Sequence, residues 1–426
     1  PADLPEVMRP ATRRIRALSA AIALIGASGV ALASPPIVLL NDEGRASSAG
    51  LVALTAGDQG RRASIIFLDE HNIRREASPG AGTFSPGSNA GLGGAVAVLP
   101  PLEPLWLPDD PRPRSKREIE SVAGVLVLAD GQRFPGRYAD SAAPDDAVAW
   151  AHPRFGLIVA PLERIAHIEG LDQPSAVAGV AERFSDRLSL TNGDTLEGFV
   201  LSLADPVEIE TDTGVIEVPR SRVARVDLAS DALQPDGLMV WLEDGSVAAL
   251  SDAQLVDDET LLLTLRDTGG QARYALTSIS AVALDASRIV PLASLRKISE
   301  APLGDRALLE GARLQPSRSL APAPLHAVDV LLPEPIAVEF ELPERALRFA
   351  GVAELPREAF PYGDCEFVVS VDGQELLRER LSPARAAVEF SVDARGSVLR
   401  VALEPGEFGP INDRALLRRA IILLSE

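Results

Sequence analysis

The chain has 426 residues, of which 46% are hydrophobic and 4% aromatic, and its formal net charge at pH 7 is −20. This length is enough for roughly two to four domains, and the hydrophobic content argues against wholesale disorder. The acidic balance repels phosphate backbones and anionic lipid, so it argues against nucleic acid as a partner. A single cysteine, Cys365, excludes an intrachain disulfide and a cysteine-rich metal site, and its apolar context predicts a buried residue.

Residues 1–33 have the composition of an export signal. Four arginines lie between residues 9 and 16, the apolar run 17–30 follows, and Ala31-Leu32-Ala33 matches an A-x-A cleavage site. The apolar run is shorter than the ~20 residues that a membrane-spanning helix needs, so a signal peptide is favoured over a membrane anchor. We therefore expect a protein exported to the periplasm or cell surface, with no membrane span after the signal is removed.

Residues 34–119 are predicted to form an N-terminal β segment. The short apolar runs IVLL, LVALT and ASIIFLD are separated by Gly, Asp and Asn, which is typical of strands. Two linkers follow, a Gly-, Ser- and Pro-rich one at 78–94 and a Pro-rich one at 100–114. The GLGG in the first linker lacks the spacing of a phosphate-binding loop and precedes Pro-rich sequence, so it does not indicate nucleotide binding.

A pattern then recurs three times. VLVLADGQRFPGRY (125–138) is similar to RLSLTNGDTLEGFV (187–200), and LMVWLEDGSVAAL (238–250) is a more diverged copy. In each copy, alternating apolar residues flank an Asp-Gly or Asn-Gly pair, which predicts a hairpin because the turn requires a positive φ. Each copy closes with a strand, a short Pro- or Ser-marked turn and a last strand, as in GLIVAPLERIAHIE (156–169) and GVIEVPRSRVARVDL (214–228).

Four or five short strands in each unit are typical of a small SH3-like or Sm-like β-barrel. The sequence therefore predicts three tandem barrels, at residues 120–170, 184–229 and 237–286, which pack together because each alone buries little surface. Pro161 and Pro219 mark the bend before each closing strand, so the repeated phrase is interpreted as scaffold rather than as a site. The acidic charge argues against RNA binding by these units.

Residues 302–426 are predicted to form a β-sandwich, because seven alternating apolar strands with tight turns follow residue 321. Three stretches of this segment carry a family resemblance: VEFELPERALRFAGVAEL (338–355), EFVVSVDGQELLRERL (366–381) and SVLRVALEPGEFGPINDRALLRRAIIL (397–423). They resemble the NPCBM family of carbohydrate-binding modules, found on exported bacterial proteins. The resemblance covers about a quarter of the chain and implies a jelly-roll, galactose-binding-like fold with a glycan ligand. Leu417 stands where the family has a tryptophan, and Leu416 where it has an acid.

No motif indicates catalysis, and we expect neither an enzyme, a cofactor nor a metal site. The four histidines, His71, His152, His167 and His326, lack the spacing of a helical metal pair, and there is no H-E-x-x-H or G-x-S-x-G. Asp69 and Glu70 adjoin His71, but a solvated strand end explains the three. Acids are plentiful, and none of their pairs is marked as the paired carboxylates of a glycosidase.

Exposed aromatic residues are the best candidates for ligand contact, because sugar-binding surfaces use aromatic faces. Phe360 and Tyr362 lie in the loop-like AFPYGD, Phe408 lies in GEFGP, and Asp413 belongs to the closing stretch of the family resemblance. The predicted ligand-binding residues are therefore Phe360, Tyr362, Phe408 and Asp413. Trp150 and Trp241 are predicted to pack in the core or between repeats.

Two functions from different classes remain open. The favoured hypothesis is an exported, non-catalytic protein that recognises a glycan or cell-surface polysaccharide through its C-terminal sandwich. The alternative is a structural or assembly protein of the cell envelope whose β repeats mediate protein–protein contacts or self-association, which the low aromatic content and the missing tryptophan favour. A third possibility is an accessory part of a carbohydrate-active enzyme system.

Overall fold

The structure is a computed structural model, and it describes residues 36–41, 46–55, 64–68, 74–77, 95–99, 123–139, 144, 146–170, 184–257, 260–303, 311–315, 322–360, 362–407, 409 and 412–425. Strands and short 3-10 turns make up the regular structure of this part, which confirms the predicted all-β class. Among these residues, no helical segment has the length and apolar character needed to cross a membrane. The predicted signal peptide and the linker at 78–94 lie outside the described residues.

The first repeat is a five-strand antiparallel unit in which the last strand returns beside the first. The pairs β6–β7, β7–β8 and β8–β9 follow chain order, and β10 then pairs with β6. A 3-10 turn at Leu162–Arg164 follows Pro161 and separates β9 from β10. The strands are β6 (Gly124–Leu128), β7 (Arg133–Tyr138), β8 (Ala147–His152), β9 (Gly156–Pro161) and β10 (Ile165–Gly170).

The second and third repeats have the same strand order. In each, the fifth strand pairs with the first, and a 3-10 turn, Arg220–Arg222 or Leu276–Ser278, precedes it. The second repeat has β11 (Asp186–Leu190), β12 (Thr195–Ser202), β13 (Val207–Thr211), β14 (Gly214–Val218) and β15 (Val223–Asp227). The third has β16 (Met239–Leu242), β17 (Val247–Asp257), β18 (Thr260–Leu265), β19 (Gln271–Ala275) and β20 (Ile279–Ala283).

The predicted hairpin turns are confirmed by their backbone conformation. Gly131, Gly193 and Gly245 each follow the Asp or Asn of the pattern and have φ angles of 83°, 91° and 93°. Glycine adopts this left-handed region without the steric cost that a Cβ atom imposes. The Asp-Gly and Asn-Gly pairs are therefore structural punctuation of the repeats.

The predicted tandem closed barrels are not seen in the described residues. No described pairing joins the fourth strand of a repeat to its fifth, as closure of the order 5-1-2-3-4 would require, and the repeats instead belong to one 20-stranded sheet. The closing strands of the first two repeats pair with each other, β10 with β15. An unpaired strand edge is a site for further pairing, and short units bury too little surface alone, so adjacent repeats share their edges.

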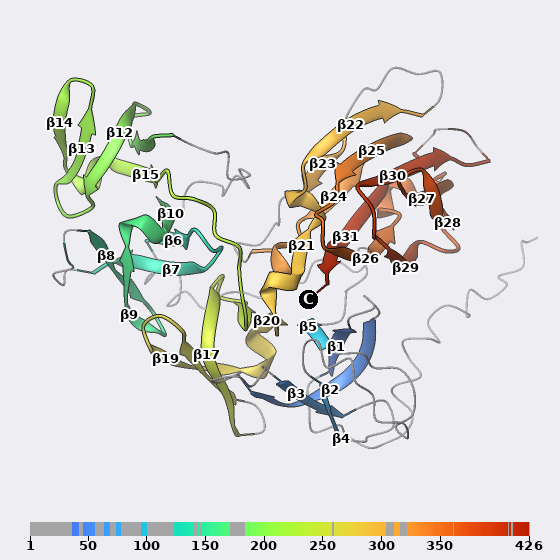
Figure 1. Cartoon of the computed structure of the whole chain (residues 1–426), viewed down its shortest axis with the longest axis horizontal. Helices are drawn as coiled ribbons and strands as arrows, with labels where there is room; N and C mark the ends of the chain where they lie inside the picture. Colours follow the sequence, from blue (N-terminus) through green and yellow to red (C-terminus); the bar gives the residue numbers. More distant parts are fainter. Residues whose placement is uncertain are drawn as a thin grey trace, which may run out of the picture. The chain divides into compact units, whose positions relative to one another are not determined.

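The N-terminal segment has the same strand order as the repeats. Strands β1 to β4 pair in succession, and β5 pairs with β1 and also with β20 of the third repeat. The β5–β20 contact thus joins two closing strands, as β10–β15 does. The strands are β1 (Pro36–Asn41), β2 (Ala46–Thr55), β3 (Ser64–Leu68), β4 (Arg74–Ala77) and β5 (Ala95–Leu99), and Figure 1 colours most of them blue.

One hydrophobic core extends through the three repeats. Trp150 is completely buried, and its Nε1–H donates to the carbonyl oxygen of Phe134 at 2.9 Å. Tyr274 of the third repeat is also buried, and its hydroxyl donates to Asp244. Trp241 is buried as well, so both tryptophans pack inside the molecule as the sequence predicted.

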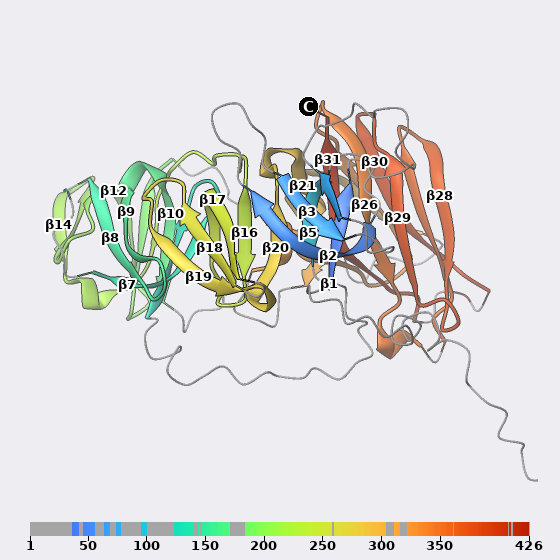
Figure 2. The same ribbon diagram turned by 90° about the horizontal axis from the view of Figure 1, so that it is seen from below.

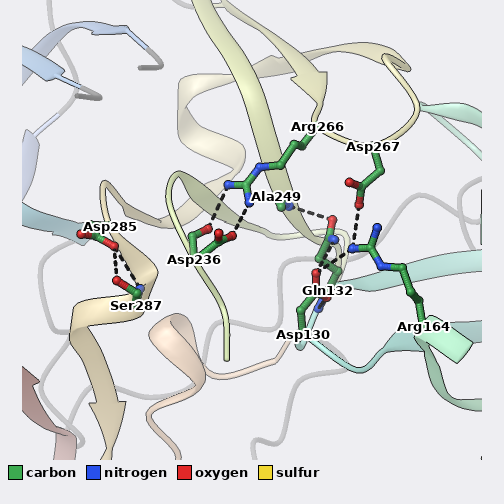
Figure 3. Close-up of polar contacts among 9 residues, drawn as sticks. All are labelled: Asp130, Gln132, Arg164, Asp236, Ala249, Arg266, Asp267, Asp285 and Ser287. Carbon is green, nitrogen blue, oxygen red and sulfur yellow. Dashed lines mark hydrogen bonds and ion pairs between the residues drawn. The ribbon is translucent and has the colours of Figure 1, made fainter. Parts of the chain in front are cut away.

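Polar contacts also join the first and third repeats. Gln132 accepts the backbone N–H of Ala249 through Oε1 at 2.9 Å, and Arg164 pairs with Asp130 and with Asp267. Figure 3 shows these side chains converging from the two repeats. The backbone N–H of Ala249 is thus satisfied by a side chain from the neighbouring unit, which fixes how the two repeats meet.

The C-terminal region is a β-sandwich, as predicted, with two sheets over one core. One sheet has the order β23-β24-β31-β26-β29 with β21 beside β31, and the other has β22-β25-β30-β27-β28. Phe390 lies between Phe349 and Phe367 in the shared core, with ring centroids 4.9 and 5.2 Å away. Figure 2 shows several of these strands side by side.

Two of the sandwich strands lie before residue 302, where the sequence analysis begins this domain. Strand β21 (Ile289–Pro291) pairs with β31, and β22 (Lys297–Pro302) pairs with β25. The remaining strands are β23 (Arg313–Gln315), β24 (Asp329–Leu332), β25 (Ile336–Glu341), β26 (Ala346–Glu354), β27 (Cys365–Val371), β28 (Gln374–Leu381), β29 (Ala387–Asp393), β30 (Val398–Pro405) and β31 (Ala415–Leu424).

Candidate ligand-binding site

The predicted ligand contacts fall on two loops of the sandwich that are hydrogen-bonded to each other. The first loop joins β26 to β27 and contains Phe360 and Tyr362, and the second joins β30 to β31 and contains Asp413. Phe408 lies in the second loop but outside the described residues. The structure therefore brings together two segments that are about fifty residues apart in the chain, as the Asp364–Asp413 hydrogen bond shows.

Asp364 connects the two loops. Its carboxylate is buried, accepts two hydrogen bonds from the Arg380 guanidinium, with Nη2 at 2.8 Å, and accepts the backbone N–H of Glu407 at 2.9 Å. The hydrogen bonds from Arg380 hold the pKa of this carboxyl below its usual range. A bidentate Arg–carboxylate pair has a fixed geometry, so this contact orients the end of the first loop.

Asp413 points into the loop pair rather than toward solvent. It is 1% exposed, and its carboxylate accepts the backbone N–H groups of Asp364 and Gly406 at 3.3 and 3.4 Å. Burial is the main cause that raises the pKa of this carboxyl to about 6, and the negative charge of Asp364 adds to it. In this arrangement Asp413 bridges the loops, and the surface available to a ligand lies outside it.

Tyr362 is the one described member of the predicted set whose side chain is exposed. Its exposed fraction is 64%, whereas Phe360 is partly buried against the sandwich core. The backbone around Tyr362 is ordered by a tight turn, since the N–H groups of Tyr362 and Gly363 both donate to the carbonyl of Ala359. A large aromatic ring is thus held in solvent on a loop whose backbone is ordered by hydrogen bonds.

The charged groups beside the loop pair could not be identified from the sequence. Arg380 and Glu407 are exposed, and Arg380 Nη2 lies 3.3 Å from Glu407 Oε2. Neither residue belongs to a recognisable motif, because Arg380 comes from β28 and meets the loops only through the strand pairing of the sandwich. An aromatic face with adjacent carboxylate and guanidinium groups can stack on a sugar ring and hydrogen-bond its hydroxyls.

Cys365 follows Asp364 directly and is completely buried, as its sequence context predicted. Burial raises the pKa of its thiol to about 12, with the nearby carboxyls of Asp413 and Asp364 acting in the same direction. A nucleophilic cysteine requires the opposite, a stabilised thiolate. The thiol therefore packs as a small apolar group under the two loops.

A histidine–serine contact between the first and third repeats has the wrong tautomer for nucleophilic catalysis. His152 Nε2 lies 2.9 Å from the hydroxyl of Ser246, and both side chains are buried. His152 Nδ1 accepts the backbone N–H groups of Arg154 and Phe155, so the ring proton resides on Nε2 and is donated to Ser246. The histidine cannot accept the serine proton in this state, and the contact is structural.

The other sequence candidates for chemistry lie partly outside the described residues. Asp69, Glu70 and His71 lie outside the described residues. His167 lies near Glu169 in the β10–β15 seam, with Nε2 and Oε2 4.0 Å apart. Across the described part of the chain, no three His, Cys, Asp or Glu side chains are grouped so that they could hold a metal ion.

These observations define an all-β chain with a C-terminal β-sandwich whose loops hold an exposed aromatic residue. No protein-family model matches the chain, and no curated protein matches it either.

Several solved carbohydrate-binding modules are similar to parts of the structure. One is the CBM51 module of Clostridium perfringens GH95 in complex with methyl-galactose (13% identity, TM-score 0.25, covering 32% of this chain and 99% of the module). Another comprises the CBM51-2 and INT domains of Clostridium perfringens ZmpB (14%, TM-score 0.27, 41% of this chain and 40% of that one). A third is the tandem CBM51 pair of a Streptococcus pneumoniae family 98 glycoside hydrolase (10%, TM-score 0.27, 91% and 88%). These similarities are too low to assign the chain to a family, so the NPCBM resemblance stays a prediction.

Proposed function

We propose that the chain is an exported, non-catalytic protein that binds a glycan or cell-surface polysaccharide at the loop pair of its C-terminal sandwich. The observation that carries the proposal is the exposed ring of Tyr362, two residues before Asp364, whose buried carboxylate pairs with the exposed guanidinium of Arg380. A ligand that contacts these loops meets a rigid surface. The carboxylates of Asp364 and Asp413 hold the loops in place, because backbone or guanidinium donors satisfy both. Preorganisation of this kind reduces the entropy cost of binding.

The finer fold assignments belong to the same proposal. An SH3-like fold of each repeat is supported by the 3-10 turn before the closing strand and by the pairing of that strand with the first. The sandwich resembles a jelly roll of the galactose-binding type, because successive connections such as β24–β25, β25–β26 and β26–β27 cross from one sheet to the other. Export rests on residues 1–33, and a secretion reporter fused to that segment tests it.

Glycan binding is tested by retention of the purified chain on a polysaccharide panel and a glycan array. Tyr362→Ala should abolish the signal, because it removes the stacking surface and leaves the buried contacts intact. Phe199→Ala is the matched control, since Phe199 is exposed to a similar degree, 60% against 64%, but lies on β12 of the second repeat. Retention of a glycan by the wild type that survives in Tyr362→Ala would contradict this site, and no retention of any glycan would contradict the function.

A second function, assembly through the β repeats, is favoured by a separate observation. On the outer face of β12, β13 and β14, which lie beside one another in Figure 1, Phe199 stands opposite Glu210 and Glu210 opposite Val215. Phe199, Leu201 and Val215 are 60%, 43% and 56% exposed. Glu210 stands between Phe199 and Val215, but several exposed apolar side chains on one face of a sheet are typical of protein contacts. A stable oligomer by light scattering that Phe199→Asp dissociates, together with no glycan binding, would favour this alternative.

A further inference from the structure

The sandwich and the third repeat share a buried apolar cluster away from the Tyr362 loops. Trp241 and Met239 of β16 contribute from the repeat, and Ile421 and Leu423 of β31 contribute from the sandwich. Ala97 of β5 is completely buried in the same cluster. The sandwich and the third repeat are therefore joined by a buried core.

A cavity of about 740 Å³ adjoins the cluster. Its size lies within the roughly 300–1,000 Å³ that is typical of small-molecule sites. Most of its lining is apolar, and two polar aromatic side chains, Trp241 and His326, stand among these residues. The apolar wall includes Leu233, Pro235, Ile289, Val290, Leu325 and Leu424.

Hydrogen bonds hold the two segments that contribute Gln234 and Ala286 to the lining of the cavity. The Arg266 guanidinium donates hydrogen bonds to the carboxylate and to the backbone carbonyl of Asp236. The backbone N–H and the hydroxyl of Ser287 both donate to the carboxylate of Asp285. Gln234 Nε2 donates to the carbonyl of Ser287 at 3.0 Å and so links the two segments. Figure 3 shows the Asp236–Arg266 and Asp285–Ser287 contacts on adjacent segments. The part of the cavity wall that these two segments form is therefore preorganised.

Two polar atoms of the lining have no hydrogen-bond partner. They are Nε1 of Trp241 and Nε2 of His326, and both atoms are shielded from solvent. The two rings contact each other edge to face, with centroids 5.2 Å apart. An unsatisfied buried donor or acceptor costs about 1–3 kcal/mol. Two such atoms side by side are unusual in a native core, and each requires a reason.

The backbone at the same place is strained. Leu325 and His326 both have left-handed φ angles, 58° and 55°, although neither is a glycine. The ring of His326 packs against Gly131, where a Cβ atom would lie 3.1 Å from Nε2. Burial lowers the pKa of His326 to about 4, so the ring is neutral at physiological pH. Strain of this kind occurs preferentially at ligand clamps and active sites.

We propose that this cavity is a binding site for a small, uncharged, largely apolar molecule that carries a hydrogen-bond-accepting oxygen. Because Nε1 of Trp241 is shielded from solvent, a ligand contacts it only after the ring turns. The indole N–H can only donate, so such a ligand presents an acceptor. The apolar wall disfavours a sugar. The charged residues of the lining are two acids and one arginine, Asp130, Glu344 and Arg345, so no net positive charge attracts a carboxylate. The site is separate from the Tyr362 loops, and it does not depend on the glycan proposal.

The test is a fluorescence titration of the full chain with prodan, an uncharged naphthalene ketone whose emission shifts to the blue in an apolar site. Wild type should show saturable, one-to-one binding. Leu233→Asp places a charge in the apolar lining and should weaken prodan binding by about tenfold or more. Leu157→Asp on β9 is the matched control, because Leu157 and Leu233 are similarly exposed, 49% and 47%, and it should bind prodan as wild type does.

A second variant addresses the donor itself. Trp241→Phe keeps an aromatic ring but removes the N–H, and it should weaken prodan binding by about threefold to tenfold, the value of one hydrogen bond. Near-ultraviolet circular dichroism shows whether Trp241→Phe is folded. If it is not, the result with Leu233→Asp, whose substitution is exposed, tests the proposal. No saturable binding by wild type, or equal affinity of wild type and Leu233→Asp, would overturn the proposal.

Discussion

Arg225 on β15 forms an ion pair with Glu169 on β10, Nη1 to Oε2 at 2.7 Å, across the seam where the first two repeats pair through their closing strands. The same guanidinium binds Asp227 with Nε and Nη2, and both carboxylates are almost fully buried. The pKa of Arg225 is raised chiefly by its hydrogen bonds to Asp227. One cation thus neutralises two buried acids on neighbouring strands, which makes the seam sensitive to its loss.

Arg225→Met should destabilise the chain by about 3–5 kcal/mol, because it removes the guanidinium that pairs with the buried carboxylates of Glu169 and Asp227. Arg187→Met is the control: Arg187 also pairs with a cross-strand acid, Glu197, but both side chains are about half exposed, and such surface pairs contribute less than about 1 kcal/mol. Urea unfolding at pH 7 compares the two free energies. Equal losses in the two variants would show that the β10–β15 seam does not depend on this cluster.

The stability of the repeats should fall in mild acid through His152. Burial lowers the pKa of this histidine to about 4, with Arg154 acting in the same direction and Asp244 against it. The unfolded chain, with a histidine pKa near 6.5, therefore binds more protons than the folded chain between about pH 6.5 and 4. This contribution is fully present above pH 6.5 and is lost as the pH falls to about 4.

The loss from His152 can approach about 3 kcal/mol, at 1.4 kcal/mol per pKa unit. Free energies of unfolding measured at several pH values between 4 and 8 should rise less steeply with pH in His152→Gln than in wild type. The variant also loses the hydrogen bond to Ser246 and the two backbone contacts of Nδ1, so it is less stable at pH 7.5. Parallel pH profiles for the two proteins would contradict the assignment.

Asp413 should have the opposite pH dependence. Its pKa is raised to about 6 by burial, so the folded state binds more protons than the unfolded state between about pH 4 and 6, and stability decreases as the pH rises through that window. Asp413→Asn keeps an acceptor for Asp364 and Gly406 without the buried charge. We expect it to stabilise the chain at pH 7.5 by about 1–3 kcal/mol, with no gain below pH 4.

A thermal melt of Asp413→Asn at pH 7.5 and at pH 3.5 checks this expectation. A variant that is less stable than wild type at the higher pH would mean that the ionised carboxylate contributes net stability to the loop pair through its two backbone hydrogen bonds. Tyr362 is not involved in these contacts, so glycan retention and stability can be measured separately on the same variant.

The parts of the fold that are set by residues close together in the sequence could be predicted from it. Asp130-Gly131 and Asn192-Gly193 indicate their hairpins because the turn requires a positive φ at glycine, and the alternation around them gives the strands. The β10–β15 pairing could not be predicted, since two strand edges meet through contacts between separate repeats. The same holds for β21 and β22, whose short sequences carry no sign that they join the sandwich.

The candidate site was predictable only in part, for a related reason. A loop-like context suggests that Phe360 and Tyr362 are both exposed, yet the turn that begins at Arg357 directs Phe360 onto the core and leaves Tyr362 in solvent. Asp364 and Arg380 come together only because β27 and β28 pair, with Glu366 opposite Arg380. Side-chain direction and cross-strand contacts of this kind are set by the tertiary structure.

Gly406 of the second loop packs directly against the backbone of Asp364, and a substitution there tests whether contact between the loops supports ligand binding. A Cβ atom at this position would lie 1.9 Å from the backbone oxygen of Asp364, so Gly406→Ala requires the loops to separate. We expect this variant to lose glycan retention while the rest of the sandwich stays folded, because the core beneath is formed by other residues.

Gly373→Ala is the control for Gly406→Ala. Gly373 lies in the β27–β28 turn with a φ of 80°, and a Cβ atom there meets nothing within 4 Å. This substitution adds backbone strain of about 1–2 kcal/mol without moving the loops, so it should lower the melting temperature and leave glycan retention unchanged. If Gly406→Ala retains the glycan as well as Gly373→Ala does, contact between the loops is not required for the site.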